Sequence, residues 1–103
     1  MKPTLPVLEA RVRLHRGDPG RQTKLLAFAE LTIGGAFVIK NIQIRRRDEP
    51  GNDEPFVVFP AERGKGAAAD RWYDIAHPCT PEARATALKA IMEAYAKATT
   101  VQA

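Results

Sequence analysis

The chain of 103 residues has a single cysteine, Cys79, and only two histidines, His15 and His77. A lone cysteine cannot form a disulfide within the chain, and these three side chains are too few for the three or four ligands of a typical zinc site. Long apolar runs are also missing, since none approaches the roughly 20 residues that cross a bilayer. We therefore expect no intrachain disulfide, no metal or other cofactor, and no membrane span.

The beginning of the chain lacks the pattern of a signal peptide, because Pro3 and Pro6 interrupt it and residues 1–8 hold no continuous apolar segment. We expect a cytoplasmic protein. The Gly-Lys-Gly step at residues 64–66 has neither the spacing nor the Lys-Ser/Thr pair of a phosphate-binding P-loop. The sequence thus contains no pattern typical of a nucleotide or small-molecule substrate site.

Asp74, His77 and Cys79 lie close in sequence, which raises the question of a nucleophilic site. A thiol nucleophile needs a histidine within hydrogen-bonding reach and a third group that orients the histidine. Pro78 fixes an extended turn between His77 and Cys79, which works against that geometry. We expect instead that Asp74 and His77 hydrogen-bond backbone groups, that Cys79 is a small filler, and that the protein is not an enzyme.

What the sequence does have is an ordinary globular composition with an excess of positive charge. It is 45% hydrophobic and 27% charged, which fits a single domain over residues 1–103 with a core at about residues 8–97. The 16 Lys and Arg outnumber the 12 Asp and Glu, giving a net charge of +4. This excess favours anionic partners, mainly nucleic acid or an acidic membrane surface.

Strand signals dominate the first three quarters of the chain. Apolar and polar residues alternate over residues 8–14, and a Gly-Gly step at residues 34–35 is typical of a hairpin turn. Turn residues at 17–20 and an acidic stretch at 46–55 indicate loops, as does the glycine- and alanine-rich segment 61–69. Five strands are expected, at residues 8–14, 24–33, 36–45, 56–59 and 71–76.

A helix is expected from Pro81 to about Lys97. Thr80 is a good N-cap, Pro81 suits the first helical position, and Glu82 complements the positive end of the helix. Apolar residues follow at helical spacing, namely Leu88, Ile91, Met92 and Tyr95. The predicted fold is therefore α+β, a five-stranded and mainly antiparallel sheet with one C-terminal helix.

A single helix can cover only one face of such a sheet, yet the strand at residues 24–33 is apolar on both. Strict alternation places Leu25, Ala27, Ala29 and Leu31 on one face and Leu26 and Phe28 on the other. Large exposed apolar surfaces usually mark association sites. We therefore expect a homodimer with a two-fold interface.

Several segments, in order, resemble the SpoVG family, the bacterial stage V sporulation protein G or septation regulators. They are Arg11-Val12-Arg13, Lys24-Leu25-Leu26-Ala27, Phe37-Val38-Ile39-Lys40-Asn41-Ile42, Phe56-Val57-Val58-Phe59-Pro60, Arg63 and Asp74-Ile75-Ala76-His77-Pro78. The resemblance extends over residues 8–97. Segments 48–55 and 64–70 look longer and more acidic than is usual in the family, and Leu26 stands where a second basic residue is common, which bears on the binding surface more than on the fold.

The resemblance implies a small sheet-plus-helix protein that dimerises and binds DNA, and in some members RNA, with low sequence stringency. It also implies a role in septation, sporulation or gene expression. Binding in the family is usually placed around the loop at residues 61–69 and the helix. The basic residues of that region are Arg63, Lys65, Arg71 and Arg84.

Two further groups of basic side chains could also pair with phosphates. One is the run Arg45, Arg46 and Arg47 at a strand end, although the acidic residues that follow could neutralise it and make it an ordinary solvated edge. The other consists of Arg11, Arg13 and Lys24 on neighbouring strands, where Glu9 could pair with the two arginines instead.

Trp72 and Tyr73 alternate on the last expected strand. One of the rings could stack on an unpaired base, although one ring in the core and one half exposed is the commoner arrangement. Helix-turn-helix, zinc-finger and RNP motifs are missing from the sequence, so base readout should not be stringent. We predict a non-catalytic nucleic-acid-binding regulator, with DNA ahead of RNA. The alternative is a protein-interaction module that recruits a cell-division or regulatory protein through its sheet edge or apolar face.

Overall fold

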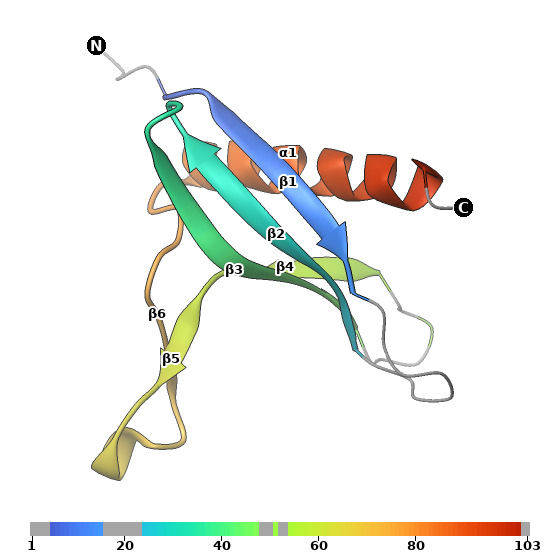
Figure 1. Cartoon of the computed structure of the whole chain (residues 1–103). Coiled ribbons are helices and arrows are strands. Elements are labelled where there is room, and N and C mark those ends of the chain that lie inside the picture. The colour runs from blue at the N-terminus through green and yellow to red at the C-terminus, as the bar shows by residue number, and fades with distance from the viewer. Residues whose placement is uncertain (1–4, 16–23, 48–50, 52–53, 102–103) are drawn as a thin grey trace.

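The protein forms two antiparallel sheets and one long helix (Figure 1). A computed structural model describes residues 5–15, 24–47, 51 and 54–101. The main sheet has the order β1-β2-β3-β4, with β1 at Leu8–Leu14, β2 at Leu25–Ile33, β3 at Phe37–Arg46 and β4 at Pro55–Val58. The second sheet pairs β5, Ala61–Arg63, with β6, Trp72–Asp74, and the helix α1 spans Pro81–Val101.

The α+β class is confirmed, but the single five-stranded sheet is wrong. The last expected strand pairs with β5 rather than with the main sheet, in the register Ala61↔Asp74, Glu62↔Tyr73 and Arg63↔Trp72. β5 lies in the segment that was expected to be an irregular loop, and β6 is shorter than the expected strand 71–76. Figure 1 shows this hairpin pointing away from the main sheet. We call residues 61–74 the arm.

The other elements follow the sequence closely. The bounds of β1 are as expected, and those of β2, β3 and β4 differ by one residue at one or both ends. Gly34 and Gly35 both take positive φ angles, 60° and 67°, which glycine adopts readily; with Ala36 they connect the paired residues Ile33 and Phe37, so the turn is one residue longer than the two-residue turn expected. The helix continues four residues beyond Lys97 to Val101. The turn expected at residues 17–20 and half of the loop expected at 46–55, residues 48–50 and 52–53, lie outside the described residues.

The start of α1 is held by the expected cap. The backbone N–H of Ala83 donates to Oγ1 of Thr80 at 3.1 Å, and Arg84 N–H donates to the Thr80 carbonyl at 2.9 Å. The side-chain bond satisfies one of the N–H groups that every helix start leaves without a partner in the helix.

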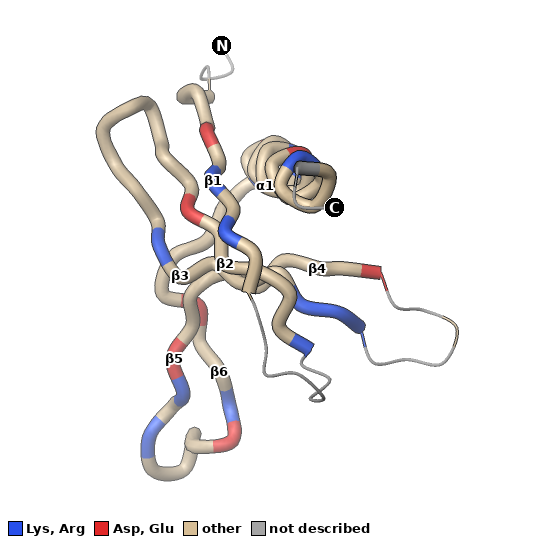
Figure 2. The backbone as a smooth tube through the Cα atoms, turned by 45° about the vertical axis from the view of Figure 1, so that its right-hand side comes forward, with Lys and Arg blue, Asp and Glu red and all other residues tan. Residues whose placement is uncertain are grey.

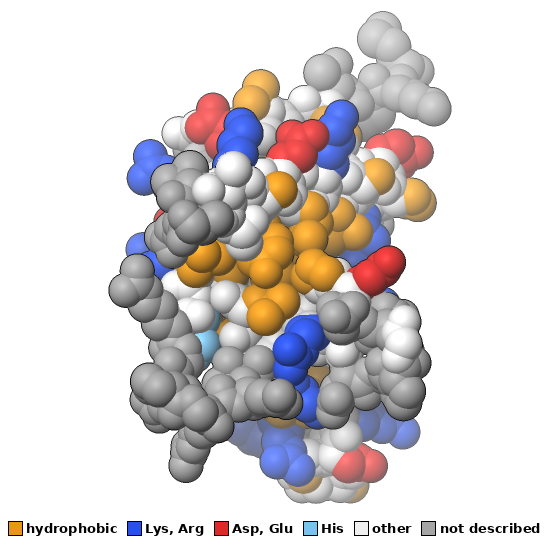
Figure 3. Space-filling view, turned by 90° about the vertical axis from the view of Figure 1, so that its right-hand side faces the viewer, with side chains coloured by type: hydrophobic (Ala, Val, Ile, Leu, Met, Phe, Trp, Pro, Cys, Tyr) orange, Lys and Arg blue, Asp and Glu red, His pale blue; other side chains and the backbone are white. Residues whose placement is uncertain are grey.

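The core lies between one face of the main sheet and α1, which runs across β1 and β2 (Figure 1). Its fully or almost fully buried side chains are Ala27, Ala29, Leu31, Ile42, Ile44, Phe59, Ala87 and Ile91. Of the predicted helix stripe, Ile91 is fully buried and Leu88 and Tyr95 pack at the margin, while the equally buried Ala87 was not predicted. Part of the hydrophobic surface stays exposed, and Figure 3 shows it as one patch of hydrophobic side chains near the middle of that view.

A bulge in β3 decides which of its residues face the core. Between the pairs Ala29↔Ile42 and Leu31↔Ile39, β2 contributes one residue but β3 contributes two, Lys40 and Asn41. Asn41 has a φ of 63°, in the left-handed region that asparagine tolerates better than most residues. Because of this extra residue, Ile39 and Ile42 both pack with the core although they are three positions apart.

A second irregularity corrects the predicted placement of Leu26. The register shifts between the pairs Leu25↔Arg45 and Ala27↔Ile44, so strict alternation fails at this point of β2. Leu26 packs against the core instead of lying on the opposite face with Phe28. Leu25, which was expected on the covered face, lies opposite Arg45 and is half-buried without packing against the core.

Candidate nucleic-acid interface

The face of the main sheet that is turned away from α1 is uncovered, and we call it the open face. The register places one row of side chains straight across it, because Arg13 is opposite Phe28, Phe28 opposite Gln43, and Gln43 opposite Val58. Arg11 lies opposite Glu30 on the same face. In this region the odd-numbered residues of β1 are exposed, and Phe28 and Glu30 are half-buried.

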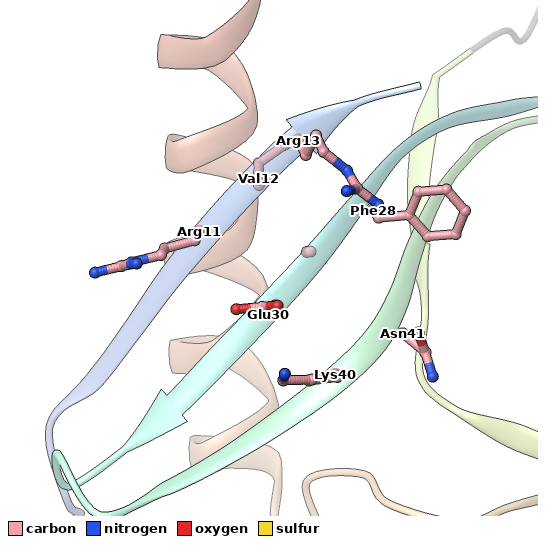
Figure 4. Close-up of a pocket in the computed structure, with 8 residues that line it drawn as sticks. Arg11, Val12, Arg13, Phe28, Glu30, Lys40 and Asn41 are labelled. Atoms are coloured by element: carbon pink, nitrogen blue, oxygen red, sulfur yellow. The ribbon is translucent and has the colours of Figure 1, made fainter. Parts of the chain in front are cut away.

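A depression of about 390 Å³ lies on the open face between β1 and β3 (Figure 4). Its charged lining consists of Arg11, Arg13, Glu30 and Lys40. Figure 4 shows Arg13 reaching towards Phe28 while Arg11 extends the other way, with Glu30 and Lys40 between them. The guanidinium carbon of Arg13 lies 5.7 Å from the centre of the Phe28 ring, within the range of a cation–π contact.

A second depression of about 690 Å³ lies between the open face and the arm. Its lining includes Gln43, Arg45, Phe56 and Val58 from the sheet, together with Trp72, Asp74 and Ile75 from the β6 side of the arm. Asn41 lines both depressions, so they adjoin at the β3 bulge. We call the two depressions together the trough. It runs across the open face and ends beneath the arm.

Polar and cationic groups along the trough are held in place by neighbours. Nη1 of Arg45 donates to Oε1 of Gln43 at 2.9 Å, which fixes both side chains on the open face. The guanidinium carbon of Arg47 lies 5.4 Å from the centre of the Phe56 ring. In the part of the chain that the structure describes, Glu9 makes no ion pair with Arg11 or Arg13, so the expected competition from this carboxylate does not occur.

The arm has a braced tip and an exposed aromatic. Nε of Arg63 donates to the carbonyl of Ala69, which closes the tip. Gly64 leaves no space for a side chain, because an added Cβ would lie 2.3 Å from the Ala68 oxygen and 2.9 Å from the Tyr73 ring. Tyr73 lies beside Gly64 and is 48% exposed, whereas Trp72 is 68% exposed and lines the trough. The commoner arrangement with one of these rings in the core is not observed.

The structure divides the predicted groups of basic residues differently. Arg63, Lys65 and Arg71 gather on the arm (Figure 2), but Arg84 lies on α1 with its guanidinium carbon 5.9 Å from the Phe59 ring. The carbonyl of Lys24 accepts from the N–H of Arg46 at 2.7 Å. Lys24 thus sits beside the run Arg45, Arg46 and Arg47 and not beside Arg11 and Arg13.

Lys40 is a basic residue of the open face that the sequence reasoning did not single out. It is exposed, and it lines the same depression as Arg11 and Arg13. The signal was present in the spacing of Ile39 and Ile42, which breaks the alternation of a strand at an asparagine. That pattern is typical of a bulge.

At the junction between arm and helix, the structure shows no hydrogen bond among the side chains of Asp74, His77 and Cys79, and none between the Asp74 carboxylate and the backbone of the described residues. His77 Nδ1 lies 2.9 Å from the Pro78 carbonyl, so the expected engagement with the backbone is confirmed for His77. Cys79 is exposed, so its expected role as a filler is wrong. Among the described residues, no three His, Cys, Asp or Glu side chains are grouped to hold a metal ion. None of the helical segments in the described ranges is long and apolar enough to cross a membrane.

Fold and surface together define a small α+β protein in which one helix covers one face of an antiparallel sheet while the other face presents basic side chains beside a projecting hairpin. The chain belongs to the SpoVG family, since the SpoVG family model matches residues 6–97.

Curated relatives agree with this assignment. A protein of Treponema denticola named "Putative septation protein SpoVG" is 33% identical over 86 residues, which cover 84% of this chain and 83% of the relative. "Putative septation protein SpoVG 1" of Listeria monocytogenes is 34% identical over 84 residues, covering 82% and 74% of the two chains. The corresponding protein of Bdellovibrio bacteriovorus is 30% identical over 79 residues, covering 77% and 67%. These relatives are named for septation and not for an enzymatic activity.

Proposed function

We propose that this protein is a non-catalytic nucleic-acid-binding regulator that contacts phosphate groups through its open face and arm. One observation supports the proposal above the others. Arg11, Arg13 and Lys40 surround one depression of the open face, are all exposed, and make no ion pair in the described part of the chain. Glu30 lines the same depression, so the three cations there outnumber the one carboxylate and can displace the counterions of a polyphosphate.

The arm carries three basic residues, Arg63, Lys65 and Arg71, interspersed with three acidic residues, Glu62, Asp70 and Asp74 (Figure 2). Lys65 and Arg71 are exposed there. Since the arm projects beyond the main sheet, its cations can reach phosphates that the flat sheet face cannot. DNA is proposed as the leading partner and RNA as the second, as the resemblance to the SpoVG family implies; phosphate contacts alone do not distinguish the two.

The names of the relatives give the proposed process. We infer a role in septation, or in the sporulation or gene regulation that accompanies it, carried out in the cytoplasm. We expect binding with low base specificity, because the described surface offers cations and rings rather than a helix suited to the major groove.

The protein is proposed to act as a homodimer. Leu26, Val57 and Tyr95 are only half-buried at the margin of the core, and none of them lines the trough. The same surface of a second copy would cover them, as in a self-complementary two-fold interface. Light scattering at micromolar concentration should give twice the monomer mass, and a monomer mass would contradict it.

The test of binding is a titration of labelled duplex DNA, single-stranded DNA and RNA at several salt concentrations. Log affinity should fall linearly with log salt, by about 0.9 for each phosphate neutralised on duplex DNA. Absence of binding to all three at low salt would overturn the proposal.

A protein-interaction module remains the second candidate, favoured by the exposed side chains of Trp72 and Tyr73 on the arm. Partner binding through apolar rings would show little dependence on salt, because few counterions would be released. A flat salt profile with a cell-division protein and no affinity for nucleic acid would select this candidate.

A further inference from the structure

We propose that the trough is a site for single-stranded nucleic acid and that Trp72 is its base-stacking platform. This inference rests on the proposed function, because it names the form of nucleic acid that the open face is shaped to accept. The arrangement of rings, amides and cations along the trough supports it.

Trp72 is the large aromatic ring that the trough leaves accessible. It is 68% exposed, yet it lines the larger depression together with Phe56 and Val58 of β4. An exposed indole is costly to leave in water, and its flat face is the surface on which an unpaired base stacks. Tyr73, on the other side of the same strand, is already engaged against the backbone around Gly64.

The two phenylalanines of the open face offer a different surface. Arg13 lies over Phe28 and Arg47 lies over Phe56, at 5.7 and 5.4 Å from the ring centres. A guanidinium plane that is held by a ring can itself stack with a base while its charge faces a phosphate. The trough therefore has two rings that arginines cover, one on β2 and one on β4, and an uncovered ring on β6 of the arm.

Amide groups occupy the positions between these rings. Gln43 lies in the row between Phe28 and Val58, and Asn41 borders both depressions. Such side chains can donate to and accept from the edges of bases that are not paired. The row from Arg13 to Val58 crosses three strand spacings, about 14 Å, which accommodates a few nucleotides.

The charge of the trough suits one strand rather than two. Its lining has four basic residues, Arg11, Arg13, Lys40 and Arg45, and two acidic residues, Glu30 and Asp74. A duplex keeps its bases stacked inside and would present only phosphates to this surface. A single strand presents both phosphates and base faces, so it alone can use the rings and amides as well as the cations.

The experiment exploits the fact that Trp72 is the single tryptophan of the chain. Its fluorescence should be quenched when single-stranded oligonucleotides of about 12 nucleotides bind, and not when a duplex of equal length binds. Oligothymidine and oligouridine serve as separate probes, so that the response of each distinguishes DNA from RNA. Quenching by at least one single strand is the expected result.

Variants make the assignment specific. Trp72→Ala should weaken single-strand binding by about 5- to 150-fold, the range for loss of one stacked base, and Trp72→Phe should restore much of it. Affinity for duplex DNA should not change. Phe37→Ala is the matched control, because Phe37 is 74% exposed and does not line either depression.

Each outcome has one meaning. Single-strand binding with unchanged fluorescence, and with wild-type affinity in Trp72→Ala, would overturn the trough site while leaving the proposed function intact. An equal loss of duplex and single-strand affinity in Trp72→Ala would also overturn it. If the wild-type protein bound neither single strands nor duplex, the proposed function itself would fail.

Discussion

The two faces of β2 differ sharply in how far their side chains are exposed. Ala27, Ala29 and Leu31 are at most 2% exposed beneath α1, whereas Phe28 and Glu30, which alternate with them, remain half-buried on the open face. The covered face is determined by packing, because each of its side chains must fit its neighbours. The open face has no such restriction, and its rings and charges are free to meet a partner.

The largest effect on stability is expected from a change on the covered face. Ile91→Ala removes a fully buried side chain of α1 and should lower the free energy of unfolding by about 2–5 kcal/mol, through lost burial and the cavity left behind. Urea denaturation followed by far-UV circular dichroism measures this. A loss below 1 kcal/mol, on the order of a surface change, would mean that α1 is not packed as described.

A change on the open face should weaken nucleic-acid binding and leave stability almost unchanged. Arg13→Ala combined with Lys40→Ala should weaken nucleic-acid binding by about 10- to 100-fold and reduce the salt slope by about 1.8, because two phosphate contacts are lost. Stability should change by less than about 1 kcal/mol. Lys89→Ala combined with Lys97→Ala removes the same charge from exposed positions of α1 and is the matched control. Equal losses in the two double variants would indicate an effect of net charge alone.

The β3 bulge connects the two faces, so a change there tests both. Asn41→Val should cost about 1–2 kcal/mol, since a β-branched residue is strained at a φ of 63°. Asn41→Gly should be close to neutral because glycine takes positive φ readily. Thermal denaturation of the two variants gives the difference, and equal melting temperatures would show that the left-handed residue is not required.

The smallest effect is expected at the start of α1. Thr80→Ala should cost about 1 kcal/mol because the Ala83 N–H loses its side-chain acceptor. Thr80→Ser keeps the hydroxyl and should retain most of the stability. Since Thr80 lies outside the trough lining, binding to nucleic acid should be unchanged in both variants. A loss of binding in Thr80→Ala would show that stability and binding are not determined by separate faces.

Signals that are local in sequence predicted the structure well. Alternation gave β1 its bounds, the Gly34-Gly35 step located the hairpin, and Thr80 and Pro81 located the start of α1. Each of these features is decided by a residue and its immediate neighbours. The SpoVG resemblance was confirmed for the same reason, because it depended on short segments in a fixed order.

Features that depend on pairing between distant segments were missed. β5 has only three residues, Ala61–Arg63, and becomes a strand because β6 lies beside it. Leu26 and Lys40 were misjudged or overlooked because bulges shift the faces of β2 and β3, and alternation alone cannot locate a bulge. The trough was beyond sequence reasoning for a similar reason, since the position of the arm brings Trp72 beside Gln43 and Arg45.

The separate sheet of the arm also has a dynamic consequence. Its ladder is only three residue pairs long, and beyond it Gly64 N–H donates to Arg71 and Ile75 N–H to Pro60, so these amides can open without disturbing the buried strands. The amide hydrogens of the arm should exchange with solvent through local opening, whereas the amide hydrogens of β2 should exchange only on global unfolding. The protein should therefore combine a rigid body of main sheet and helix with a short arm that can adjust its shape to a bound partner.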